Sequence, residues 1–205
     1  MFVHSGSLRP HHFPNKLDMM IHNTEISLAF DWYLRNILPI VSQKAIQQKY
    51  GYHGIYTHTS AVVFRGIDYA LSLHENPKPV ILACAFHDIA RTHDGPDYEH
   101  GAKAIPIIND ILRDFIPVPQ QYANSIISAV RNHTGGMIAP DYVSACLWDA
   151  DRTRLAWDCG YNPIFFSTDR AKQVASGDCM KYLKFMEKHM SKYARGIIPQ
   201  LDKIY

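Results

Sequence analysis

One stretch of this chain, PKPVILACAFHDIAR at residues 77–91, limits its possible folds more than any other. It is apolar without a break from Pro79 to Phe86, and it leads directly into the adjacent ionisable pair His87 and Asp88. A run of this length is too long for a typical strand, and proline at its start suits the first turn of a helix. The sequence therefore predicts a buried helix with a histidine and an aspartate at its end.

The His87–Asp88 pair is the strongest sign of chemistry in the chain. Ionisable groups at the end of a buried helix are costly unless they are paired or bound to a metal. Imidazole nitrogen and carboxylate oxygen bind borderline and hard divalent metals, and neighbouring helical residues, about 100° apart, can bracket one ion. We therefore interpret His87 and Asp88 as metal ligands.

Apolar residues at helical spacing recur through most of the remaining sequence, whereas an alternating β pattern of useful length does not. Besides the buried helix, the predicted helices span about residues 24–38, 58–73, 100–112, 120–132, 141–157 and 178–193. Thr24 is the expected N-cap of the first helix, and Pro39 should kink or end it. Residues 159–168, CGYNPIFFST, should form a loop. Residues 1–22 are rich in Pro, His and Ser and should form an extended N-terminal arm, which leaves residues 23–205 as one all-α domain.

Composition excludes several classes of protein. The 21 Lys and Arg nearly balance the 19 Asp and Glu, so we expect no binding to duplex nucleic acid. The four cysteines are widely spaced and form no CxxC pair, which argues against a zinc ribbon or a disulfide framework. The first residues lack a basic stretch followed by an apolar run, and the longest apolar helix candidate contains Asp31 and Arg35. We therefore expect a soluble, cytoplasmic protein with no membrane partner.

Three further histidines, His58, His100 and His133, lie at the ends of predicted helices and could also bind metal. With 12 histidines in 205 residues, a single histidine means little. A histidine at a helix terminus also has an ordinary use as a cap or as a charge that suits the helix dipole. We interpret His53, His74, His93 and the histidines near the N-terminus as surface or structural residues.

The string LWDADR offers two more carboxylates, Asp149 and Asp151. Two residues apart on a helix, they point about 200° apart, so at most one of them faces a central metal. Asp151 lies one turn after Leu147 and beside Ala150, on the more apolar side, which favours it as the ligand. We expect Asp149 to be a solvated or salt-bridged carboxylate.

The succession of His58, the His87–Asp88 pair and Asp151, with the strings AFHDIAR and LWDADR, resembles the HD-domain superfamily of metal-dependent phosphohydrolases. The resemblance runs over residues 52–171, and its later string FFSTDRAK is similar to a downstream segment of small bacterial members. It implies a single-domain helical bundle of the HD type. In that family the aspartate followed by Arg or Lys is the ligand, which supports Asp151.

The resemblance also bears on the number of metal ions. In binuclear members the aspartate of the His-Asp pair bridges two ions, and two histidines between it and the final aspartate hold the second ion. By resemblance these are His100, in YEHGA, and His133, in VRNHTGG. The implied cofactor is one or two divalent ions, with Mn, Fe, Co, Ni, Zn and Mg all open.

Cations and carboxylates near the predicted ligands are candidates for catalysis. Arg91 and Lys103 each follow a predicted ligand by three positions, so either could grip a phosphate. A carboxylate is also needed nearby, to position the attacking water or to protonate the leaving group. The candidates for this role are the loop residues Asp94, Asp97 and Glu99.

The expected activity is hydrolysis of a phosphate ester, in a nucleotide or another small phosphorylated compound, by water activated on a bound metal. One alternative is a binuclear iron oxygenase, because some HD-fold proteins with a similar ligand set use two irons to activate dioxygen. Another is a regulatory module that binds metal or nucleotide without turnover. Metal content and the dependence of turnover on dioxygen separate these three classes.

Overall fold

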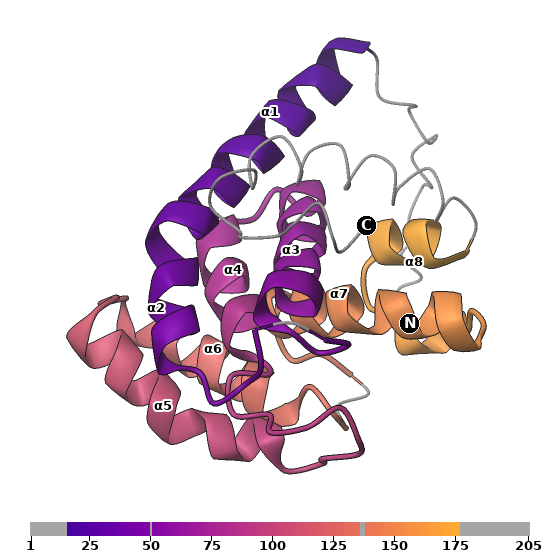
Figure 1. The fold of residues 1–205 in the computed structure, drawn as a ribbon. Helices are drawn as coiled ribbons and strands as arrows, with labels where there is room; N and C mark the ends of the chain where they lie inside the picture. The colour runs from indigo at the N-terminus through magenta and orange to yellow at the C-terminus, as the bar shows by residue number, and fades with distance from the viewer. Residues whose placement is uncertain (1–15, 50, 136–137, 177–205) are drawn as a thin grey trace, which may run out of the picture.

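The computed structural model describes residues 16–49, 51–135 and 138–176, and all regular structure in these ranges is helical (Figure 1). The α-helices are α1 (Lys16–Trp32), α2 (Leu38–Lys44), α3 (Ser60–Ser72), α4 (Pro77–Phe86), α5 (His100–Asp114), α6 (Gln120–Asn132), α7 (Tyr142–Cys159) and α8 (Asp169–Ser176). Shorter turns of other types are the π-helical η1 (Tyr33–Ile37) and η2 (Ile55–Thr59) and the 3-10 turn η3 (Pro163–Phe165). The predicted all-α fold class is confirmed. None of the described helices combines the length and apolarity needed to cross a membrane.

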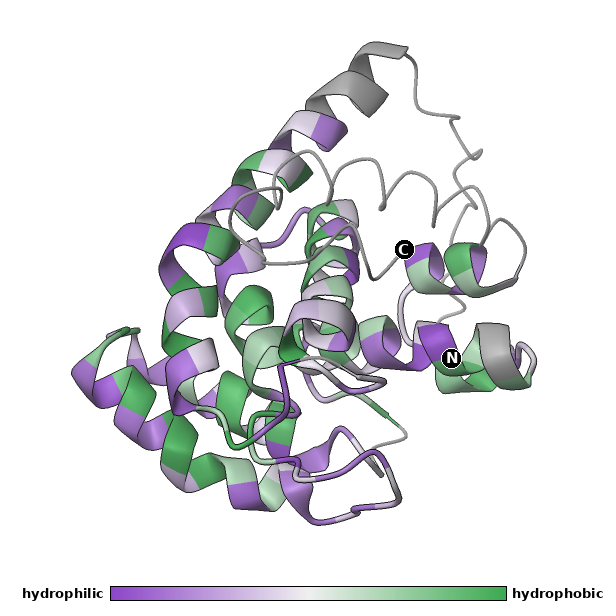
Figure 2. Cartoon of the chain, viewed as in Figure 1, coloured by the Kyte–Doolittle hydropathy of each residue, from purple (hydrophilic) through white to green (hydrophobic). Residues whose placement is uncertain are grey.

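Helix α4 is the predicted buried helix, and it lies in the middle of the molecule (Figure 1). Its side chains from Val80 to Phe86 are at most 2% exposed, and it packs against α3, α6 and α7. Asn76 caps its start by accepting a hydrogen bond from the backbone N–H of Lys78 at 3.0 Å. By contrast, α5 alternates between hydrophilic and hydrophobic residues, as a helix with one solvent-facing side does (Figure 2).

The first helical segment continues past Pro39 instead of ending there. The chain passes from α1 through the π-helical turn η1 directly into α2, whose second residue is Pro39. Proline has no N–H, and its ring crowds the carbonyl four residues earlier, which belongs to Arg35 in η1. The wider π turn accommodates this crowding, so the helix changes register and continues.

The predicted start of the first helix is wrong, because α1 begins at Lys16 rather than after Thr24. Residues 16–22 of the expected N-terminal arm are therefore helical, and the expected domain boundary falls inside α1. A tertiary contact accompanies this extension: Nε2 of His22 lies 2.7 Å from Oδ1 of the buried Asp68 on α3. Tertiary packing often stabilises a helix that local propensity does not predict. The rest of the arm, residues 1–15, and the predicted helix at 178–193 lie outside the described residues.

The segment after α7 is a loop, as predicted, apart from the short turn η3. Phe166 is 6% exposed and joins the core, and Tyr161 stacks on it with the ring centroids 5.7 Å apart. Phe165 remains 45% exposed. The loop leads into α8, a short helix that the sequence did not indicate, and α8 packs against α7.

Candidate metal centre

Six side chains from five different elements converge beside the C-terminal end of α4. They are His58 in η2, His87 and Asp88 at the end of α4, His100 at the start of α5, His133 after the end of α6, and Asp151 in α7. Five of them are at most 4% exposed, and Asp151 is 24% exposed. The structure thus brings together all six residues that were predicted from the sequence as metal ligands.

One group of ligand atoms, which we call the His58 half, comes from His58, His87, Asp88 and Asp151. Nε2 of His58 lies 3.2 Å from Nε2 of His87 and 3.1 Å from Oδ1 of Asp151. Oδ2 of Asp88 lies 3.4 Å from Nε2 of His87 and 3.7 Å from Nε2 of His58. The four ligand atoms therefore face a common space, which is the arrangement that several donors need to hold one ion.

A second group, which we call the His100 half, comes from His100, His133 and Asp88. Nε2 of His100 lies 2.7 Å from Nε2 of His133 and 2.9 Å from Oδ1 of Asp88. Nε2 of His133 lies 3.9 Å from the same carboxylate oxygen. Three donors therefore meet here as well.

Asp88 is the residue that the two halves share. Its Oδ2 faces the His58 half, and its Oδ1 faces the His100 half. The ligand atoms of His58, His87 and Asp88 all lie within 4.8 Å of one another, and so do those of Asp88, His100 and His133. One carboxylate with an oxygen in each group is the geometry of a bridging ligand between two ions.

The backbone fixes which ring nitrogen of three histidines can bind a metal. Nδ1 of His87 donates to the carbonyl oxygen of Cys84 at 2.7 Å, and Nδ1 of His133 donates to that of Val130 at 2.7 Å. Nδ1 of His100 makes the corresponding bond to the carbonyl oxygen of Asp97, a much shorter contact than the 3.4 Å to Nη1 of Arg91, so the carbonyl decides the position of its hydrogen. A carbonyl oxygen only accepts, so each Nδ1 carries a hydrogen and each neutral ring presents a lone pair on Nε2.

The facing lone pairs indicate that the site is built for a cation. When His100 and His133 are both neutral, their Nε2 lone pairs point toward one another across 2.7 Å and repel. In addition, Oδ2 of Asp88 and Nδ1 of His58 are buried without a hydrogen-bond partner among the described residues. Buried polar atoms without partners are costly. Divalent ions would satisfy Asp88 Oδ2 and relieve the repulsion, so the residues present fit such ions.

The electrostatics of the cluster keep most of its ligands in the state that metal binding requires. Burial raises the pKa of Asp88 and of Asp151, but the neighbouring histidines outweigh it and lower the pKa of both carboxyls. Burial and repulsion from His87 lower the pKa of His133 to about 4. For His87, burial favours the neutral ring, but the charge of Asp88 outweighs it and raises the pKa to about 9. Without metal, a proton therefore occupies His87 at neutral pH.

Asp149 was expected to be a solvated or salt-bridged carboxylate, and the structure shows that it is not solvated. It is 0% exposed, and it accepts hydrogen bonds from the backbone N–H groups of Ser167 at 2.9 Å and Thr168 at 2.7 Å. Burial raises its pKa despite these donors. Asp149 therefore holds the segment before α8, while Asp151 on another side of α7 faces the cluster, in agreement with their angular separation.

Arg91 lies beside the cluster. Its Nη1 is 3.7 Å from Oδ1 of Asp88. Its other donors hold the following loop, because Nε donates to the carbonyl oxygen of His93 at 3.1 Å and Nη2 to that of Gly95 at 2.9 Å. Arg91 thus places a positive charge next to the shared carboxylate and fixes the loop after α4.

The other two predicted catalytic residues make their contacts elsewhere. Lys103 is 54% exposed and pairs with Asp97 at 3.3 Å and with Glu99 at 3.6 Å. Oδ1 of Asp94 lies 3.1 Å from both the backbone nitrogen and Nδ1 of His53. Among the described contacts, neither side chain touches a cluster residue directly.

Gly101 is a residue of the site that sequence analysis did not single out. The start of α5 and the end of α6 approach so closely at Gly101 that a side chain there would collide with backbone atoms of α6. This close approach brings His100 and His133 together. The available signal was a glycine directly after a candidate ligand, in the string YEHGA.

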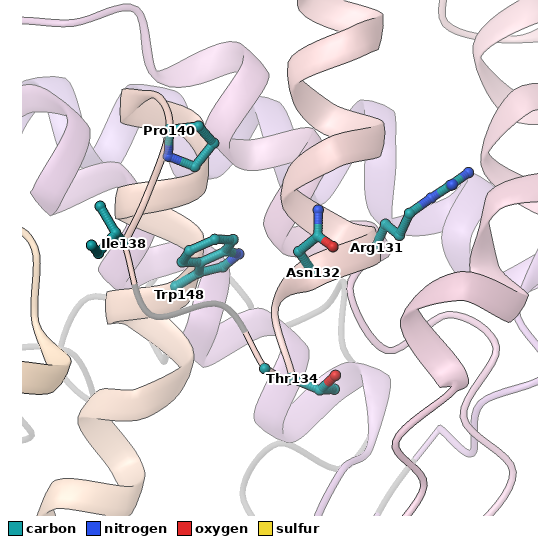
Figure 3. Close-up of a pocket in the computed structure, with 7 residues that line it drawn as sticks. Arg131, Asn132, Thr134, Ile138, Pro140 and Trp148 are labelled. Carbon is teal, nitrogen blue, oxygen red and sulfur yellow. The ribbon is translucent and has the colours of Figure 1, made fainter.

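A surface pocket lies next to the His100 half, between the end of α6 and α7 (Figure 3). Asn132 and Thr134, the two sequence neighbours of His133, line it together with Pro140 and Trp148. The indole N–H of Trp148 donates to the carbonyl oxygen of Ala129 at 2.9 Å. In Figure 3 the side chain of Arg131 extends away from Trp148. The pocket thus offers polar side chains and an apolar wall close to a candidate ligand.

Comparison with known proteins finds similarity to a domain family and to a solved structure. The model of the HD domain family matches residues 55–157, a range that contains all six clustered residues. A crystal structure of a predicted HD superfamily hydrolase from an uncultured Thermotogales bacterium is similar in fold, with a TM-score of 0.57 and 22% sequence identity. The similarity covers 78% of this chain and 93% of that one. No curated protein matches the chain.

Proposed function

The chain belongs to the HD domain family, and from this premise we propose that it is a metal-dependent phosphohydrolase acting on a small phosphorylated compound. The family and the buried cluster support metal-dependent hydrolysis in general. We infer that the substrate is a phosphate ester from the electrostatics of the cluster and from the resemblance of the ligand pattern to that of phosphohydrolases.

The observation that carries the proposal is the position of Asp88 between the two halves, with one oxygen toward each. Asp88 would thus share in holding two ions, and a pair of ions at one site can act together on a single substrate group. Divalent ions bound there would lower the pKa of a coordinated water and stabilise negative charge on a phosphoryl oxygen.

The chain's own residues supply the setting for this chemistry. The two carboxylates of Asp88 and Asp151 and four neutral imidazoles leave the loaded site with excess positive charge, which suits an anionic phosphate. The low exposure of five of the ligands limits water around the ions and strengthens electrostatic interactions there. Arg91 adds a fixed positive charge beside Asp88. Asp94 holds His53 in this proposal rather than protonating the leaving group.

The test is elemental analysis of the purified protein together with a phosphate-release screen. The screen covers nucleotides and sugar phosphates, each with added Mn, Fe, Co, Ni, Zn or Mg ions. We expect bound transition metal and metal-dependent phosphate release from at least one class of substrate. Asp88→Ala should remove both, while its circular dichroism stays helical. Full metal occupancy without turnover of any substrate would instead favour the regulatory-module alternative.

The two-part cluster also favours a second candidate, a binuclear iron oxygenase. Histidine and carboxylate ligands in two groups that share Asp88 would hold two irons as well as two other divalent ions. Anaerobic turnover separates the two chemistries, because hydrolysis needs only water. We expect phosphate release to continue without dioxygen. Turnover that stops in its absence would favour the oxygenase.

A further inference from the structure

Among the six clustered side chains, Asp151 is the most exposed to solvent. The other five side chains are at most 4% exposed, whereas Asp151 is 24% exposed. A substrate group that reaches the cluster from solvent therefore approaches past Asp151 and the residues beside it. The chemistry of these neighbours decides which groups can bind there.

Arg154 lies three residues after Asp151 on α7, so the two side chains project from the same side of the helix. Its guanidinium lies over the ring of Tyr52, 4.1 Å from the ring centroid. The ring of Tyr52 meets that of His53 at 4.7 Å, and His53 meets His58 at 5.3 Å, both between centroids. These contacts form an unbroken series from a candidate metal ligand to the cation of Arg154.

The middle of this series is held in place from a second loop. Asp94 contacts both the backbone nitrogen and the ring of His53 at 3.1 Å. Tyr52 nevertheless remains 43% exposed. Tyr52 is therefore supported from the protein side while part of the residue reaches solvent, and its ring restrains the guanidinium of Arg154.

We propose that Arg154 and Tyr52 form a subsite that binds an anionic group of the substrate next to the metal cluster. A guanidinium presents several N–H donors in a plane that matches the oxygens of a phosphate or carboxylate. Because the ring of Tyr52 already restrains it, Arg154 loses less conformational freedom on binding an anion. A flexible lysine at this position would lack both advantages.

This inference rests on the proposed function, and it restricts the class of substrate that the protein is expected to hydrolyse. The metal cluster would hold the phosphate that is cleaved, and side chains one helical turn apart have their Cβ atoms about 5–6 Å from one another. Arg154 is thus placed to bind a group next to the cleaved phosphate rather than the cleaved phosphate itself. The expected substrates are phosphate esters that carry a second anionic group beside the first, such as a diphosphate.

The test is calorimetric titration of Mn²⁺-loaded protein with methylenediphosphonate, a diphosphate analogue that resists hydrolysis, and with inorganic phosphate. For Arg154→Ala we expect the affinity for methylenediphosphonate to fall roughly tenfold or more and that for phosphate to change little. Arg154→Lys should keep part of the affinity. Tyr52→Ala should weaken binding, and Tyr52→Phe should not, because the ring rather than the hydroxyl supports Arg154. Metal content should match wild type in all four variants.

Arg113→Ala is the matched control, because Arg113 is an exposed arginine that pairs with Asp110 and Asp114 on α5. Unchanged affinity in Arg154→Ala would overturn the subsite, as would a loss of affinity that follows a loss of metal. The proposed function fails separately. If methylenediphosphonate binds through Arg154 but no substrate releases phosphate, the subsite stands and the phosphohydrolase does not. If phosphate esters are hydrolysed with the same KM by wild type and Arg154→Ala, only the subsite is excluded.

Discussion

A Cβ atom on Gly101 would lie only 2.5 Å from the carbonyl oxygen of Val130. The same carbonyl accepts the hydrogen bond from Nδ1 of His133 that orients this ring, and Gly101 directly follows His100. The missing side chain at Gly101 therefore sets how closely His100 and His133 approach. Gly101, which has only a hydrogen atom in place of a side chain, is therefore part of the candidate metal site.

Gly101→Ala should separate the start of α5 from the end of α6 and displace His100 from Asp88. We expect the number of bound ions to fall from two toward one per chain, because the His58 half keeps its own four ligands. Overpacking of this kind also costs about 1–3 kcal/mol of stability. Elemental analysis and thermal unfolding measure the two effects.

Gly135→Ala is the control for this prediction, since a Cβ at Gly135 would meet none of the described atoms of other elements within 4 Å. It should bind metal like the wild type. Two ions per chain in Gly101→Ala would show that the close contact does not determine the geometry of the His100 half.

Removing His100 or His133 should lower the number of bound ions by one. Removing His87 should cause loss of both metal retention and activity. His100→Ala and His133→Ala each take one of three donors from the His100 half and none from the His58 half. The double variant should still bind one ion per chain. If wild-type protein never exceeds one ion under metal-replete conditions, the binuclear arrangement is excluded.

Asp151→Asn and Asp149→Asn should have different effects, the first on metal binding and the second on stability. Asp151→Asn removes an anionic ligand, so we expect loss of metal and activity with an intact helical circular dichroism spectrum. Asp149→Asn keeps only one carbonyl oxygen for the N–H groups of Ser167 and Thr168, and it buries an NH₂ group beside these donors. It should lose about 1–3 kcal/mol of stability and keep its metal. The opposite pattern would mean that Asp149 is the ligand.

Metal affinity should rise with pH through the neutral range. The pKa of His87, raised to about 9 mainly by Asp88 against the effect of burial, leaves a proton on this ring that an incoming ion must displace. Between about pH 7 and pH 9 the apparent affinity of the His58 half should therefore increase roughly tenfold per pH unit and then level off. His133, with a pKa of about 4, is neutral throughout this range and adds no slope. Chelator competition at several pH values measures the profile, and a flat one would contradict it.

Much of the fold could be predicted from local patterns. The uninterrupted apolar run at residues 79–86 required a buried helix, and the helix predicted at 120–132 matches α6 at both ends. These segments succeed because periodicity and burial agree along their whole length. The early start of α1 and the π turn before Pro39 were not predictable in the same way. Both involve packing between segments or a change in backbone register that propensity does not encode.

The sequence by itself determined which side chains could bind metal and in what order they occur, because imidazole and carboxylate chemistry belongs to the residue type. Only the tertiary structure decided how they combine. It turned the two oxygens of Asp88 toward different groups of ligands, buried Asp149 against the segment before α8, and placed Arg154 over Tyr52. Each of these arrangements joins residues from separate helices or loops, and their distances depend on how the helices pack rather than on spacing along the chain.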